Sequence, residues 1–104
     1  YESFHLLEMT DCEYMYRFRD GFPIYDESEK ILKNYTCVHF DGPHQTVDVL
    51  REALFFCGRS HVHTTFCFDD YKKYDMENII NVCNRYGFQE LKRGEQKIIL
   101  RRNP

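Results

Sequence analysis

Residues 35–70 read YTCVHFDGPHQTVDVLREALFFCGRSHVHTTFCFDD, and they carry the clearest pattern in the chain. Aromatic and β-branched residues predict a strand over 35–40 that ends at the turn-forming sequence DGP. Apolar residues at helical spacing predict a helix over 46–57, with Gly58 placed to end it in a left-handed cap. The apolar run over 62–68 predicts a second strand that is buried on both faces. The expected apolar side of the helix consists of Val47, Leu50, Leu54 and Cys57, widened by Val49, Ala53 and Phe56.

Further elements are expected after this stretch. Asp75 is a suitable cap for a helix that begins at Met76 and is stopped by Gly87. Two more strands are expected over 88–92 and 97–101, separated by a polar turn that contains a glycine.

The amino-terminal third has a weaker pattern. A short apolar segment predicts a buried strand over 3–9. Thr10, with Glu13 three residues later, resembles the start of a helix. The charged residues 26–30 indicate an exposed turn or a short helix.

The order of the elements sets the expected fold class. Strand, helix, strand, helix and strand in succession are typical of a parallel sheet with right-handed crossovers. We therefore expect one α/β domain over residues 1–104, with a Rossmann-like, mostly parallel sheet that finishes in an antiparallel hairpin.

Composition excludes several classes of protein. The 104 residues are 42% hydrophobic and 30% charged, which is typical of a globular chain rather than a disordered one. The formal charge of −3 provides no basic surface for nucleic acid. No apolar run approaches the roughly 20 residues that a transmembrane helix needs. The five cysteines are odd in number and lack CxxC spacing, so we interpret them as free thiols of a cytoplasmic protein.

Acidic residues follow both central strands. Asp41 comes directly after the first, Asp69 and Asp70 come after the second, and His44 stands close behind Asp41. Because ligands of an open parallel sheet bind at the carboxyl ends of its strands, these side chains are expected to converge on one crevice. Clustered carboxylates suit a hard divalent ion such as Mg²⁺, and a neutral histidine beside them suits proton transfer. The alternative is an ordinary turn after the first strand and a solvated loop after the second.

A second histidine grouping carries less weight. His61 and His63 flank Val62, and together with His39 they could suggest a metal site. Histidines in or near strands are more often packed or exposed, so we do not expect one there.

Three stretches resemble one enzyme family. They are VHFDGPHQTVDVLREALFF at 38–56, TTFCFDDY at 64–71 and NRYGF at 84–88. They are similar to the second half of class I S-adenosylmethionine-dependent methyltransferases, above all metal-dependent sugar and small-molecule O-methyltransferases. The resemblance covers residues 35 to 102. It implies that 35–40 and 62–68 are the fourth and fifth strands of a seven-stranded sheet, with the final hairpin as the sixth and seventh.

The resemblance also implies roles for individual residues. Asp41, Asp69 and Asp70 would hold Mg²⁺, and His44 would be the catalytic base. Asp11 would lie near the adenine of S-adenosylmethionine, and Asp41 would contribute to the cofactor site as well as to the metal site. The implied substrate is a hydroxyl group of a sugar or another small molecule, and homo-oligomer formation is left open.

Two parts of the family pattern have no counterpart in this sequence. These are the glycine-rich loop after the first strand and the acid after the second strand that holds the ribose. Since the chain opens on Tyr1 within strand-like sequence, we expect it to be the carboxyl-terminal portion of a longer enzyme. The alternatives are a non-catalytic binding or structural module with the same half-fold, and a small unrelated α/β interaction domain.

Overall fold

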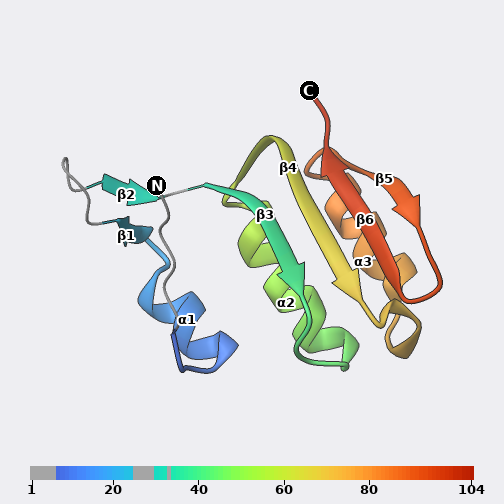
Figure 1. The fold of residues 1–104 in the computed structure, drawn as a ribbon, viewed down its shortest axis with the longest axis horizontal. Helices are drawn as coiled ribbons and strands as arrows, with labels where there is room; N and C mark the ends of the chain where they lie inside the picture. The colour runs from blue at the N-terminus through green and yellow to red at the C-terminus, as the bar shows by residue number, and fades with distance from the viewer. Residues whose placement is uncertain (1–6, 25–29, 33) are drawn as a thin grey trace.

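A computed structural model describes residues 7–24, 30–32 and 34–104 (Figure 1). These residues form a compact α/β domain with three α-helices and one short 3-10 helix. In chain order the elements are α1 (Asp11–Arg17), β1 (Phe22–Ile24), β2 (Lys30–Leu32), β3 (Tyr35–Phe40), α2 (Thr46–Cys57), β4 (Ser60–Asp69), the 3-10 helix η1 (Tyr71–Lys73), α3 (Met76–Asn84), β5 (Phe88–Arg93) and β6 (Lys97–Arg102).

The main sheet has four strands in the order β3-β4-β6-β5. β3 and β4 are parallel neighbours, and Phe40 is opposite Phe68 in their register. β6 runs antiparallel to both of its neighbours, β4 and β5. The sheet is therefore mixed: a parallel pair joined by helix α2, as the sequence predicts, and a carboxyl-terminal hairpin whose second strand lies between β4 and β5.

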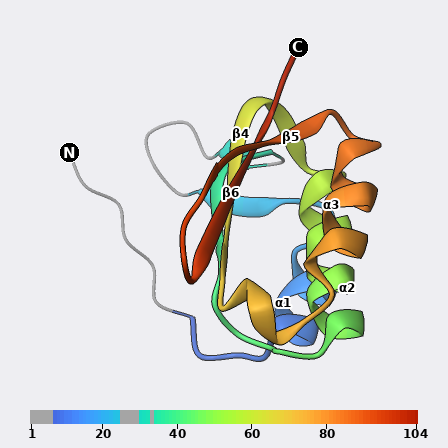
Figure 2. The ribbon, with the colours of Figure 1, turned by 90° about the vertical axis from the view of Figure 1, so that its right-hand side faces the viewer.

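The helices α2 and α3 cover one face of this sheet (Figure 2). The core lies between them and the sheet, and it includes Phe66 and Phe68, both 0% exposed. The predicted burial of 62–68 on both faces is wrong, because Thr65, Cys67 and Asp69 alternate with the core residues and remain partly exposed. A strand with one covered face needs apolar side chains at every second position only.

Helix α2 has the predicted bounds but a rotated core side. Val49, Ala53 and Cys57 are buried, as a helix packed on a sheet requires. Val47 and Leu54, which the sequence pattern places in the core stripe, are 64% and 41% exposed. The apolar residues of this helix occupy more than half of its circumference, so periodicity alone does not fix which side faces the sheet.

The two expected glycine caps differ. Gly87, which the sequence predicts as the stop of the second helix, follows the cap residue Arg85 by two positions and is left-handed, with a φ of 92°. Gly58 is right-handed, with a φ of −69°, so the prediction of a left-handed cap is wrong there. Arg59 donates its backbone N–H to the carbonyl of Phe56 at 3.1 Å, and this tighter turn ends α2 without a positive φ.

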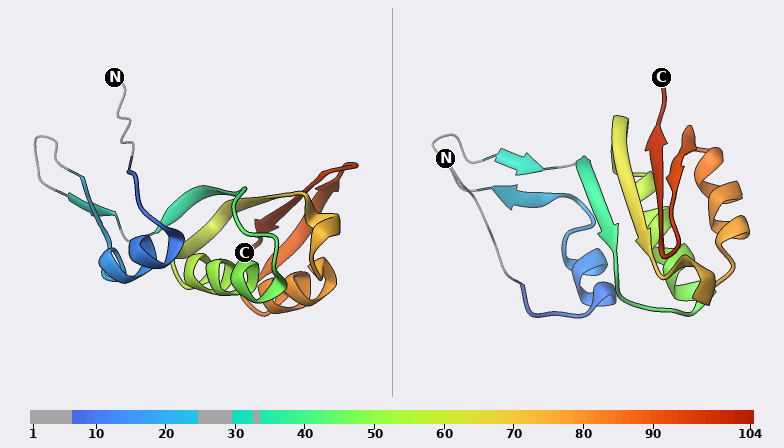
Figure 3. Two further views of the ribbon diagram at one scale, coloured as in Figure 1. Left: turned by 90° about the horizontal axis from the view of Figure 1, so that it is seen from below. Right: turned by 45° about the vertical axis from the view of Figure 1, so that its right-hand side comes forward.

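The amino-terminal part stands beside β3, on the side away from β4 (Figure 3). The expected strand 3–9 falls mostly outside the described residues, and residues 7–9 are not a strand. The helix start is confirmed: Thr10 and Glu13 form the reciprocal capping box of α1. β1 and β2 form a small antiparallel pair that the sequence did not predict. The segment 26–30 also lies outside the description, apart from Lys30 at the start of β2.

No helix in the described ranges has the length and apolar character needed to cross a bilayer.

Candidate functional site at the strand ends

Asp41 and Asp69 lie at the same edge of the main sheet. Asp41 directly follows β3, Asp69 is the last residue of β4, and the register that pairs Phe40 with Phe68 brings the two acids side by side. Since the strands are parallel, both carboxylates are at carboxyl ends, where open α/β sheets bind ligands. The sequence-based expectation of a shared edge therefore agrees with the structure.

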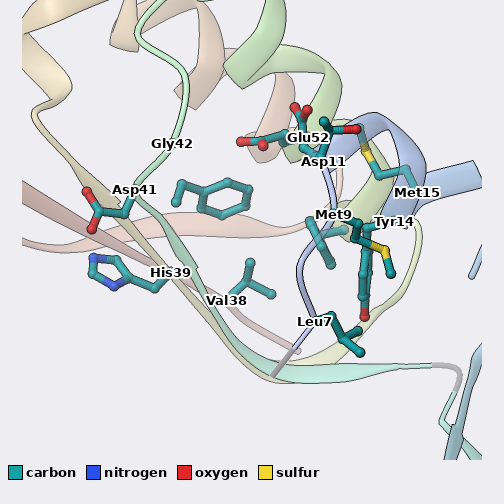
Figure 4. A pocket seen from close by; sticks show the side chains of 13 residues that line it. Leu7, Met9, Asp11, Tyr14, Met15, Val38, His39, Asp41, Gly42 and Glu52 are labelled. Carbon is teal, nitrogen blue, oxygen red and sulfur yellow. The ribbon is translucent and has the colours of Figure 1, made fainter. Parts of the chain in front are cut away.

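A histidine joins these two acids. One nitrogen of His39 and one carboxylate oxygen from each of Asp41 and Asp69 all lie within 4.8 Å of one another. His39 and Asp41 are two positions apart, so they project to the same face of the sheet, opposite the buried Phe40 between them. Figure 4 shows the His39 ring beside the Asp41 carboxylate, on the other side of the backbone from Val38.

Lys97 neutralises part of this cluster. It is opposite Asp69 in the antiparallel register of β4 and β6, and its Nζ lies 2.9 Å from Asp69 Oδ1. The hydrogen bond to Lys97 lowers the pKa of the Asp69 carboxyl. The same contact with Asp69 raises the pKa of Lys97. Asp69 is therefore an anion with an ammonium partner already in place.

Asp70 is directed to a different partner. Its backbone is left-handed, with a φ of 52°, at the point where β4 gives way to η1. Its Oδ2 lies 3.4 Å from Nε2 of His44, and both side chains are partly exposed. The structure thus separates the four predicted site residues of the strand ends into two pairs, Asp41 with Asp69 and His44 with Asp70.

A cavity of about 590 Å³ adjoins this group, and both His39 and Asp41 line it. Val38, Phe40 and Phe56 provide apolar lining, and Asp11 on α1 contributes a carboxylate (Figure 4). Asp11 and Asp41, the two residues expected at the cofactor, therefore line the same cavity.

Glu52 on α2 also lines this cavity, and it was not among the predicted site residues. Burial, a hydrogen bond with Asp11 and the charge of Asp11 raise the pKa of Glu52 to about 7. Near pH 7, Glu52 is therefore present in both its protonated and its ionised form. A signal was present in the sequence: Glu52 follows Val49 by three positions and precedes Phe56 by four, which is the spacing of the helix side that faces inward.

The donor set of His39, Asp41 and Asp69 fits a divalent metal ion. Imidazole nitrogen and carboxylate oxygen are both common ligands, and three donors leave positions for water or substrate. The predicted set was Asp41, Asp69 and Asp70. Two of its members belong to this group, whereas Asp70 faces His44. The prediction lacks His39, whose sequence pattern suggests a metal site only in combination with His61 and His63.

These observations define the chain as an α/β domain with an acidic, histidine-containing site at the carboxyl ends of two parallel strands. Comparison with family models, with curated proteins and with solved structures finds no match for it.

Proposed function

We propose that this chain is part of an S-adenosylmethionine-dependent O-methyltransferase that uses a divalent metal ion and acts on a hydroxyl of a sugar or another small molecule. The observation that supports the proposal best is the placement of Asp41 and Asp69 at neighbouring parallel strand ends, with His39 in the same group. The resemblance of residues 35 to 102 to class I methyltransferases implies that acids at these strand ends hold the metal ion used in methyl transfer. We further propose a cytoplasmic location, which the five free thiols support.

His44 is the proposed base. Its Nε2 faces the Asp70 carboxylate at 3.4 Å, so a neutral ring with its proton on Nε2 leaves the Nδ1 lone pair free. Nδ1 would then accept the proton of the substrate hydroxyl, and S-adenosylmethionine, when bound, would supply the methyl group, its sulfonium sulfur leaving as the neutral thioether of S-adenosylhomocysteine. When bound, a metal ion at the strand ends makes this hydroxyl more acidic. Asp70 stabilises the imidazolium that forms, because its negative charge lies on the opposite side of the ring.

The cavity lined by Asp11 and Asp41 is the proposed place of the cofactor. Its apolar lining suits the adenine ring, and its carboxylates suit hydroxyl groups and positive charge. The residues that would cradle the methionine part and hold the ribose have no counterpart in this sequence. The proposal for this chain is therefore limited to the metal ion, the base and one side of the cofactor cavity.

The decisive measurement is cofactor binding. We expect the full-length protein to bind S-adenosylmethionine in isothermal titration calorimetry. Absence of binding would overturn the enzyme proposal.

Mutant kinetics on the full-length protein test the residue roles. Asp41→Asn and Asp69→Asn should lower both metal affinity and turnover, and excess metal should partly restore turnover. His44→Ala should slow methyl transfer by roughly 10²- to 10⁴-fold, with no rescue by metal, because it removes a general base. Turnover that persists in the presence of a chelator would contradict the metal assignment alone.

A second candidate is a non-catalytic binding or structural module. The contact between Lys97 and Asp69 favours it, because an internal ammonium group stabilises the carboxylates without any metal ion. Under this alternative, neither S-adenosylmethionine nor a divalent ion should bind.

A further inference from the structure

We infer that His39, Asp41 and Asp69 form a site that selects a first-row transition-metal dication such as Mn²⁺ or Co²⁺ over Mg²⁺, and that Lys97 is the internal counter-ion which the metal displaces. The inference rests on the proposed function only in placing an ion at these strand ends. Its evidence and its test concern metal binding, with no methyl transfer involved.

The geometry already brings the three donors to one point. All three donor atoms lie within 4.8 Å of one another. Ligands of a single ion, with bonds of about 2.1 Å, lie at most about 4.2 Å apart. The three side chains therefore need to move by well under about 1 Å to share an ion. His39 and Asp41 are exposed, so such a movement disturbs no packing in the core.

The kinds of donor atom set the metal preference. Mg²⁺ takes oxygen ligands and loses its water reluctantly, so the imidazole nitrogen of this site adds little to its binding of Mg²⁺. Imidazole favours transition metals, whose affinity for such sites rises from Mn²⁺ to Co²⁺. Asp70 would have supplied a third carboxylate, but its side chain faces His44. The third donor of this group is therefore the nitrogen of His39 and not the oxygen of a third carboxylate.

Lys97 adds competition between two cations. Its Nζ lies 2.9 Å from Asp69 Oδ1, close to the place that a metal ion would take. The Lys97 side chain is 50% exposed, so it can leave for solvent at small cost. Without metal, Lys97 neutralises Asp69; with metal, two cations side by side repel each other and the ammonium group moves away. Replacement of Lys97 should therefore strengthen metal binding, the opposite of what general damage to the protein would do.

Mn²⁺ is the probe of choice. The thiol of Cys67 is opposite His39 in the β3–β4 register and partly exposed, so Zn²⁺ could bind through sulfur and obscure the result. Titration of the protein with Mn²⁺, followed through the electron paramagnetic resonance signal of the free ion, measures binding directly. We expect one site per chain. In a competition titration, we expect that half of the bound Mn²⁺ is displaced only when the concentration of Mg²⁺ is at least about tenfold higher than that of Mn²⁺.

Two pairs of variants test the roles of the side chains. His39→Ala should weaken Mn²⁺ binding at least tenfold, since even the loss of a supporting outer-shell group costs about 10- to 100-fold. His61→Ala, at an exposed histidine near the other end of β4, should leave the affinity unchanged. Lys97→Met should tighten Mn²⁺ binding several-fold, whereas Lys92→Met on β5 should not. Circular dichroism confirms that each variant is folded.

Several results would overturn the inference. They are the same Mn²⁺ affinity in His39→Ala and wild type, weaker binding in Lys97→Met, or equal affinity for Mg²⁺ and Mn²⁺. None of these results depends on the binding of S-adenosylmethionine, which is the separate test of the proposed function. Conversely, Mn²⁺ binding that depends on His39 in a protein without affinity for the cofactor would retain the metal site and remove the methyltransferase.

Discussion

The carboxyl of Glu52 is held against Asp11 at the rim of the cavity, and its protonation links pH to stability. Its pKa is about 7 in the folded protein and 4.5 for an ordinary glutamate, so the folded state binds the proton more tightly. The stability that this proton contributes is complete below about pH 4.5 and is lost as pH rises through about 7.

We therefore predict that wild-type stability falls by about 1 kcal/mol between about pH 5 and about pH 8 through this group, a figure reduced from the full linkage because Glu52 is only partly buried. Glu52→Gln should lack this decrease. Urea unfolding at several pH values measures it. Glu95→Gln, in the exposed turn between β5 and β6, is the control and should keep the wild-type pH profile. Parallel profiles for wild type and Glu52→Gln would contradict the pairing of Glu52 with Asp11.

At the same scale, the sequence allowed some site residues to be predicted and not others. Asp41 and Asp69 could be predicted, because a strand end can be recognised from the apolar run before it. Asp70 was expected to join them, but its left-handed backbone turns its side chain toward His44. A positive φ at a residue other than glycine is not a property that local sequence shows. His39 could have been predicted from the alternation of side chains along a strand. This alternation places His39, one residue before the end of β3, on the same face as Asp41.

Among the elements, β3 and β4 meet in an irregular way at their amino ends. Tyr35 is opposite Ser60, but Cys37 is already opposite Thr65, so β4 contains extra residues there. Thr64, 0% exposed, bridges this bulge: its hydroxyl donates to the carbonyl of Tyr35 at 2.6 Å and accepts from the backbone N–H of His61 at 2.9 Å. One side chain thus satisfies two backbone groups that the regular ladder leaves unpaired.

We predict that Thr64→Val destabilises the domain by about 1 kcal/mol, because it leaves two partly buried backbone groups without this partner while keeping the shape of the side chain. The midpoint of urea unfolding measures this. The neighbouring Thr65→Val is a matched control, since Thr65 is only partly buried and its hydroxyl makes one bond of 3.3 Å, to the carbonyl of His63. Equal midpoints for the two variants would show that the bridge contributes nothing.

Element bounds were predictable where local signals were strong. The strand 35–40 and the helix 46–57 agree with β3 and α2 to the residue, since turn-forming residues end the strand and a full apolar side marks the helix. The pair β1–β2 was missed because three-residue strands that pair only with each other leave little periodicity. The orientation of α2 and the open face of β4 depend on which layers pack on the sheet. That information lies in tertiary contacts and not in any single segment.

Across the whole molecule, the five cysteines differ in how deeply they are buried, so their reactivity can test the packing. All five are free thiols in the structure, as the sequence predicts. Cys12 and Cys37 are exposed, whereas Cys57 and Cys83 are buried between α2 and α3 with their sulfur atoms 3.8 Å apart. The hydrogen bond with Cys57, together with burial, raises the pKa of the Cys83 thiol and reduces its reactivity further.

We predict two fast-reacting thiols in the native protein and five in denaturant, counted with a thiol-specific chromogenic reagent without reductant. Cys67, partly exposed and with its pKa raised by burial, should react more slowly than the fast pair. As a control, Cys12→Ser should lower the fast count by one. A native Cys57 or Cys83 that reacts as fast as Cys12 would contradict the packing of α2 on α3, and a denatured count of three or one would indicate disulfides.

The position of β6 between β4 and β5 has a consequence for the folding pathway. The turn between β5 and β6 lets that hairpin form from near neighbours in sequence, and α2 connects β3 to β4 over a short distance. Within the main sheet the two halves join through β4 and β6, where Thr65 pairs with Arg101, so this junction closes the longest loop between its described strands. The entropy cost of closing this loop arises before the favourable contacts between β4 and β6 form. Docking of the hairpin onto β4 should therefore be the slow step of folding. Until it occurs, β4 has an unpaired apolar edge, and this intermediate is the species in which self-association competes with folding.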